Sequence, residues 1–217
     1  MRVDRRGSAP QWLRDKSSVG SFVLMVESSP SLLLLGPRLS LADWAALPED
    51  VPGEFVDGRL VEEEVPDYVH EVLVAWLIRI LWNWGEGRGV LVAGSDARFA
   101  VSPGRGRKPD ITVFLAERRP PARGAVTIPP DIAVEVISDS ARDERRDREE
   151  KRAEYAAFGV PRYWLVDPQL RRIDFLALRD KGYELEATSE RGLVSVPGCA
   201  GLEIDLDAMW AKIDELE

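Results

Sequence analysis

The sequence predicts a single soluble α/β domain. Residues 66–84 carry apolar side chains at steps of three and four, which is typical of a long helix packed on one face. Residues 111–115 and 132–137 are almost continuously apolar, as expected for strands inside a sheet. The chain has 217 residues and a hydrophobic fraction of 45%, which supplies one sizeable core and leaves too little chain for a second.

The first part of the chain does not fit this pattern. Residues 1–37 are expected to form an extension of uncertain structure, with the compact domain at 38–217. This extension contains two apolar stretches, which are interrupted by Glu27 and Pro30. Neither stretch reaches the roughly 20 residues that span a bilayer. No membrane association is therefore expected. Two interpretations stay open: a partly disordered segment, or a start assigned too far upstream.

The domain is predicted to begin with a short helix followed by a hairpin. Ser40 followed by Asp43 forms a helix N-cap pattern. Residues 54–62 form two short apolar stretches around Asp57 and Gly58, and an Asp-Gly pair is a strong hairpin signal.

The elements after the long helix follow from apolar runs and turn residues. In order, we expect a pair of strands at 90–92 and 98–101, a basic turn at 103–108, strands at 111–115 and 132–137, an arginine- and glutamate-rich helix at 141–157, a strand at 162–167, a hairpin of 171–178 and 183–188, and a closing helix at 205–216.

Cysteine and histidine usage excludes several kinds of chemistry. Cys199 is the only cysteine and His70 the only histidine, so the chain has neither an internal disulfide nor a Cys/His zinc site. A reducing, cytoplasmic location is expected. The net charge of −9 argues against a protein that coats nucleic acid with a broad basic surface. It does not exclude a metal-dependent nuclease, because a carboxylate cluster is negative until its cation binds.

Two acidic residues stand out by their position in apolar strands. A carboxylate in an apolar strand is costly unless it is paired or bound to a cation, and Glu135 lies between Val134 and Val136. The two-residue period of a strand puts Glu135 on the same face as Ala133. Asp110 begins another apolar strand. Two carboxylates at neighbouring strand ends can hold Mg²⁺ near a phosphate.

A lysine on the next helix is a candidate partner for these acids. Asp147, Lys151 and Tyr155 follow one another at steps of four and should share one helix face. A lysine beside a metal can position a water and offset charge on a phosphate. A solvated helix charge is the alternative interpretation of Lys151.

Five segments together resemble a known family. These are GEFVDGRLVE, YVH at the start of the long helix, RKPDITVF, PDIAVEVISDS and KRAEYAAFGVPRYWLVDP, in this order. They are similar to the Uma-type putative restriction endonucleases, a family of the PD-(D/E)XK nuclease superfamily. The resemblance covers about residues 40–180.

The resemblance implies a restriction-endonuclease-like core, which is a mixed sheet of four or more strands flanked by helices. Asp110 and Glu135 would be the two acids of the motif, and Mg²⁺, for which Mn²⁺ can substitute, would bind them and the backbone carbonyl of Val136. The catalytic lysine usually stands two residues after the second acid, where this chain has Ile137. The resemblance implies that Lys151 replaces it from the following helix.

Several other residues have both a structural and a functional interpretation. Glu54 matches an early acid of the family pattern and could complete the metal shell, and His70 could contact metal or phosphate. Arg105, Arg107 and Lys108 could contact a phosphate backbone, although a basic loop is usually only solvated. These last assignments stay open at the level of sequence.

The function expected from these observations is Mg²⁺-dependent hydrolysis of DNA phosphodiester bonds by a metal-activated water. One alternative is a catalytically silent protein of the same fold that binds nucleic acid or a protein partner. Another is a homodimer whose tryptophan-rich helix is buried between subunits.

Overall fold

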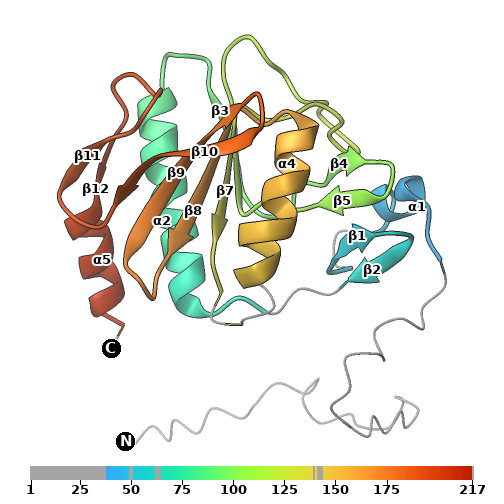
Figure 1. Cartoon of the computed structure of the whole chain (residues 1–217), viewed down its shortest axis with the longest axis horizontal. Coiled ribbons are helices and arrows are strands. Elements are labelled where there is room, and N and C mark those ends of the chain that lie inside the picture. Colours follow the sequence, from blue (N-terminus) through green and yellow to red (C-terminus); the bar gives the residue numbers. More distant parts are fainter. Residues whose placement is uncertain (1–37, 49–50, 62–64, 139, 141–143, 217) are drawn as a thin grey trace, which may run out of the picture. The chain divides into compact units, whose positions relative to one another are not determined.

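The computed structural model describes residues 38–48, 51–61, 65–138, 140 and 144–216. The predicted N-terminal extension lies outside these residues. The described part contains a six-stranded sheet, a four-stranded sheet and a two-stranded sheet, with helices packed around them (Figure 1).

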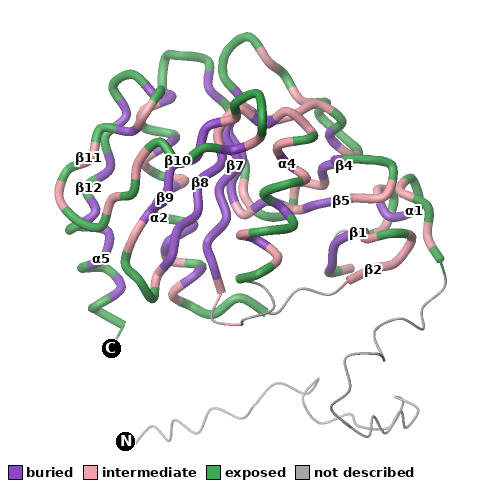
Figure 2. The backbone as a smooth tube through the Cα atoms, viewed as in Figure 1, coloured by how far each residue is buried: buried purple, intermediate pink, exposed green. Residues whose placement is uncertain are grey.

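The six-stranded sheet is mixed, as the resemblance implied. β7 and β8 are parallel, and the other neighbouring pairs are antiparallel. In spatial order the strands are β10 (Gly182–Ser189), β9 (Arg172–Arg179), β8 (Arg162–Asp167), β7 (Ile132–Val136), β6 (Ile111–Phe114) and β3 (Leu91–Ala93). The central strands are the most buried part of the chain (Figure 2), which explains their continuous apolar sequence.

Helices cover both faces of this sheet. α2 (Tyr68–Gly85) and α5 (Leu206–Asp214) pack with Val134 and Val136 in one apolar cluster. On the opposite face, Tyr155 of α4 (Arg152–Phe158) packs in a second cluster, which includes Ala133 and Ile137. Alternate residues of β7 therefore enter different clusters, and the predicted face of Glu135 is the one covered by α4.

The four-stranded sheet lies at the start of the domain and has the order β2-β1-β5-β4. Its elements are α1 (Leu41–Ala45), which precedes it, β1 (Glu54–Val56), β2 (Arg59–Val61), β4 (Phe99–Ser102) and β5 (Arg105–Arg107). Ser40 and Asp43 form the capping box expected for α1. The predicted hairpin is also confirmed, with Asp57 and Gly58 both at positive φ in its turn.

The strands expected at 90–92 and 98–101 are present as β3 and β4, of which β3 pairs with β6 and β4 pairs with β5. One expectation for this region is wrong. The basic turn at 103–108 contains the strand β5. Gly106 lies at its centre, where a Cβ atom would stand 2.4 Å from the ring of Trp44. The glycine thus serves close packing of Trp44 rather than a flexible loop.

A small hairpin was not expected from the sequence. β11 (Leu193–Ser195) and β12 (Glu203–Asp205) pair antiparallel just before α5. Both are short, and their residues alternate between exposed and partly or fully buried positions.

Candidate active site

Asp110, which directly precedes β6, lies opposite Glu135 of the neighbouring strand β7. β6 and β7 pair antiparallel with Ile111 opposite Val134. If this register continues by one residue, from Ile111 to Asp110 and from Val134 to Glu135, Asp110 stands opposite Glu135. Directly opposed side chains of an antiparallel pair share a face, with Cβ atoms about 4.5–5.5 Å apart. The strand pairing therefore brings together the two acids that the sequence singled out.

Glu135 is buried and makes two strong side-chain contacts. Its Oε2 accepts a hydrogen bond from Lys151 Nζ at 2.9 Å, and its Oε1 accepts one from the hydroxyl of Tyr155 at 2.7 Å. Only 1% of Glu135 is exposed. Burial raises the pKa of Glu135 well above its ordinary value. Lys151 opposes this, while the nearby carboxylates of Asp110 and Asp147 add to it.

Lys151 comes from a π-helical turn, Arg146–Lys151, that leads directly into α4. Its Nζ lies 3.1 Å from Asp147 Oδ1 and 3.8 Å from Glu54 Oε1, in addition to its contact with Glu135. Burial lowers the pKa of Lys151, but the three carboxylates outweigh it and raise the pKa well above the ordinary value. Lys151 is therefore a charged residue held among acids, and the alternative of a solvated helix charge is wrong.

Asp110 is held by the backbone of β7 and by α2. Its Oδ2 accepts a hydrogen bond from the backbone N–H of Val136 at 2.7 Å and lies 3.1 Å from Nε2 of His70. His70 is placed at the start of α2, where its N–H donates to the Asp67 side chain that caps the helix. Burial lowers the pKa of His70, but Asp110 and Glu71 outweigh this and raise it.

A buried arginine cluster supports the site from behind. Arg107 is fully buried; its Nη1 donates to Glu54 Oε2 at 2.6 Å and its Nε donates to Glu154 Oε2 at 2.6 Å. Glu54 Oε1 also accepts from the backbone N–H of Lys108 at 3.0 Å. Arg107 therefore cannot contact a phosphate, and this expectation is corrected because carboxylates already occupy its guanidinium. Both oxygens of Glu54 face donors, as expected for a structural acid.

The other two basic residues of this segment remain partly accessible. The Arg105 side chain is 27% exposed and pairs with Asp57 and Glu154. Lys108 Nζ lies 3.0 Å from Asp96, whose side chain is 87% exposed. Of the three basic residues, Lys108 lies nearest the acids, since it lines the same cavity as Asp110 and Glu135.

The sequence missed the role of Glu154, which joins Arg105 and Arg107 to α4. A signal was present in the spacing of the two arginines. Side chains two residues apart in a strand share a face, so a strand at this position would have pointed both at one partner.

The charge state of Glu54 makes acid stability a test of this cluster. Burial would raise the pKa of Glu54, but Lys151, Arg107 and the Lys108 N–H together hold it below its ordinary value of 4.5. A lowered folded-state pKa contributes stability that is present above pH 4.5 and is lost as the pH falls through the folded value. Urea unfolding from about pH 6 down to about pH 2, which spans the range below 4.5 where the loss falls, should therefore show a shallower loss for Glu54→Gln than for wild type. The exposed Glu203→Gln should follow wild type, and parallel profiles for all three proteins would contradict this account.

A cavity of about 250 Å³ opens at this end of β6 and β7. Its lining includes His70, Lys108, Asp110, Glu135, Val136, Asp147 and Lys151. Three carboxylates, two lysines and a histidine thus surround a space that a small group can enter. This combination of opposed acids and a buried lysine is suited to hydrolysis at phosphorus with a divalent cation.

Comparisons with known proteins bear on the family and the fold of the chain. Residues 40–207 match the Uma2 family, described as "Putative restriction endonuclease". A crystal structure of a putative nuclease belonging to DUF820 from Anabaena variabilis is similar in fold, with a TM-score of 0.62 and 20% identity. The match covers 80% of this chain and 98% of that one. No curated protein matches.

No helix in the described part of the chain is both long and apolar enough to cross a membrane. The fold is the restriction-endonuclease-like one that the five sequence segments implied. Because the family match spans most of the chain, the protein belongs to the Uma2 family of putative restriction endonucleases.

Proposed function

We propose that this protein is a Mg²⁺-dependent endonuclease that hydrolyses DNA phosphodiester bonds. The observation that carries the proposal is the position of Asp110 opposite Glu135, with Lys151 2.9 Å from Glu135. Family membership and the nuclease-like fold support the same reaction class.

The donor set fits Mg²⁺, which is usually held by one or two carboxylates and keeps several waters. Asp110 and Glu135 supply the carboxylates, and Val136, whose backbone carbonyl would be a further ligand, lines the same cavity. Each carboxylate oxygen has more than one lone pair, so Glu135 can bind a cation while it accepts from Lys151 and Tyr155. The charges of Asp110 and Asp147, which help to raise the pKa of Glu135, would be offset by a cation.

A bound Mg²⁺ supplies Lewis-acid stabilisation of the phosphate and activation of water. The residues of the chain position the reactants. Lys151 orients the attacking water and offsets negative charge on the phosphate. Tyr155 fixes one Glu135 oxygen, and His70 fixes one Asp110 oxygen, so neither carboxylate rotates away. Lys108 contacts the phosphate backbone at the edge of the cavity.

A second candidate function is DNA binding without cleavage. Lys151 and Tyr155 already engage both oxygens of Glu135. Among the described residues, no group of three histidine, cysteine or acidic side chains is arranged to hold a metal. An acid whose contacts are satisfied by a lysine and a tyrosine is stable without a cation, as a silent member of the fold would require.

Thermal unfolding and cleavage together separate the two functions. Wild type should melt at a higher temperature with Mg²⁺ or Mn²⁺ than with EDTA, because a ligand that binds only the folded state stabilises it. Asp110→Asn should lose this shift. Plasmid DNA, single-stranded DNA and RNA are then incubated with each protein and Mg²⁺. A metal shift together with cleavage by wild type alone supports the endonuclease, whereas DNA binding without either result favours the silent protein.

A further inference from the structure

A second and larger cavity of about 880 Å³ adjoins the candidate active site. The two cavities share Asp96 and Lys108 in their linings. Thr112 lines the larger cavity and stands two residues after Asp110 on β6, so both side chains project from the same face of that strand. The two cavities are therefore neighbours, and both border the ion pair of Lys108 with Asp96.

The floor of this cavity is aromatic and apolar. Phe99, Phe114 and Val126 contribute to its lining, and the two phenylalanine rings stack on each other with their planes 10° apart. Only 1% of Phe99 and 3% of Phe114 are exposed. Its volume lies within the range of roughly 300–1,000 Å³ that small-ligand sites occupy.

One buried polar atom in this cavity lacks a partner. Thr112 is 1% exposed, and within the described part of the chain its Oγ1 makes no hydrogen bond. Buried hydroxyl groups are normally hydrogen-bonded, and leaving one unpaired is costly. The hydroxyl lies in the cavity lining, where a ligand with donor or acceptor groups can satisfy it.

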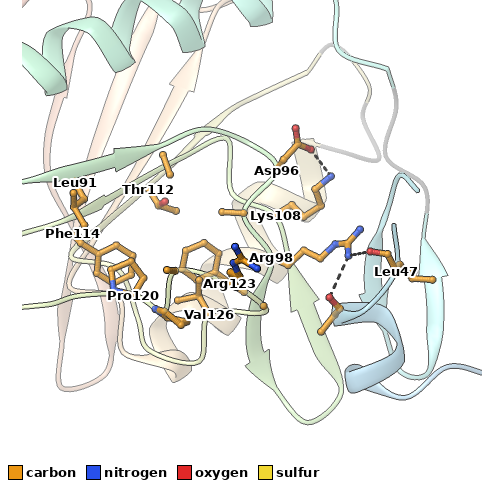
Figure 3. Close-up of a pocket in the computed structure, with 17 residues that line it drawn as sticks. Leu47, Leu91, Asp96, Arg98, Lys108, Thr112, Phe114, Pro120, Arg123 and Val126 are labelled. Carbon is orange, nitrogen blue, oxygen red and sulfur yellow. Dashed lines mark hydrogen bonds and ion pairs between the residues drawn. The ribbon is translucent and has the colours of Figure 1, made fainter. Parts of the chain in front are cut away.

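The rim of the cavity is positively charged. The lining contains three basic residues, Arg98, Lys108 and Arg123, and one acid, Asp96. Its charged side chains therefore have an excess of two positive charges. The chain as a whole carries a net charge of −9. Arg98 is held in place by the backbone carbonyls of Ala45 and Leu47 (Figure 3) and by that of Pro48 at 2.7 Å. The local reversal of charge favours a ligand with phosphate groups.

We propose that this cavity binds one unpaired base of the DNA strand, next to the phosphate that is cleaved. The base enters beside Phe99 and Phe114 and forms a hydrogen bond with the Thr112 hydroxyl, and its flanking phosphate contacts Arg123. A base in a closed duplex cannot reach such a cavity without leaving the stack. The inference rests on the proposed function and adds to it a substrate class: single-stranded or locally unpaired DNA.

The test uses the full chain, Mg²⁺, and a short single-stranded DNA with phosphorothioate linkages, which resist hydrolysis. The base analogue 2-aminopurine is placed at successive positions, and its fluorescence reports entry of a base among aromatic rings. Fluorescence anisotropy gives the affinity. We expect an emission change at one position of the bound strand, and at least about tenfold weaker binding of the matched duplex, because unpairing a base has a free-energy cost.

Two variants test the cavity itself. Thr112→Val keeps the shape of the side chain and removes only the unpaired hydroxyl, so binding should weaken by roughly 3- to 10-fold, as expected for one hydrogen bond. Arg123→Glu reverses an exposed charge and should weaken binding by about tenfold or more. Arg191→Glu makes the same charge change at another exposed loop residue outside this cavity and serves as the control.

The outcomes separate this inference from the proposed function. If wild type cuts DNA while both cavity variants bind like the control, the cavity is not the base site and the endonuclease stands. Equal binding of duplex and single strand, with constant emission, would overturn the inference in the same way. Stronger binding of RNA would overturn the choice of DNA. If wild type neither binds nor cuts nucleic acid, both conclusions fail.

Discussion

Replacing Lys151 by methionine should abolish cleavage and weaken the fold. Methionine keeps most of the length of the side chain but leaves Glu135 and Asp147 buried without the cation that lies within 3.1 Å of both. Removing one partner of a buried ion pair costs about 3–5 kcal/mol. Loss of a charge that stabilises the transition state should lower the cleavage rate by at least about 100-fold.

The two effects of Lys151→Met are measured separately. Urea unfolding gives the change in stability, and cleavage is assayed at a temperature where circular dichroism shows the variant folded. Lys181→Met, an exposed lysine in the turn between β9 and β10, is the matched control and should change neither quantity. Wild-type cleavage by folded Lys151→Met would remove Lys151 from the mechanism.

Replacing Arg107 by methionine should destabilise the protein to a similar degree, by about 3–5 kcal/mol, without a direct effect on the chemistry. The variant leaves Glu54, which is 1% exposed, without its partner at 2.6 Å. Because Arg107 is fully buried and cannot reach a phosphate, the folded fraction should keep a cleavage rate close to wild type.

The neighbouring arginine provides the control for Arg107. Arg105 also contacts Glu154, but its side chain is 27% exposed, and partly solvated pairs contribute only about 0–1 kcal/mol. Arg105→Met should therefore change the free energy of unfolding much less than Arg107→Met. Equal losses for the two variants would show that burial does not set the strength of these pairs.

The acids of the site could be predicted because local sequence determines their surroundings. An acid inside an apolar strand needs a partner or a cation, and this reasoning identified Glu135. The period of the strand gave its face correctly, because Ala133 and Ile137 do pack on the α4 side. The position of Asp110 opposite Glu135 depends on the register of β6 and β7, which no local pattern in the sequence gives. The resemblance to the family indicated only that the two acids belong to one motif.

The parts that could not be predicted depend on contacts between distant segments. Arg105, Gly106 and Arg107 have the composition of a solvated turn, and only pairing with β1 and β4 makes them a strand. The sequence around Arg107 likewise does not indicate that this side chain is buried, because its partners are 47 and 53 residues away. Apolar periodicity shows whether a segment is a strand but not which strand it pairs with, so the pairing of β3 with β6 and of β4 with β5 could not be predicted.

The π-helical turn at Arg146–Lys151 has a consequence for the history of the protein. A π turn holds one residue more than an α turn between bonded groups, and such turns are frequent at functional sites. Loss of a single codon there would restore ordinary α geometry and change how the residues before the turn are oriented relative to Tyr155 and the rest of α4, while every acid stayed in the sequence. Loss of activity among relatives would then be visible in the length of the segment between Glu135 and Tyr155, even where all the motif letters are retained.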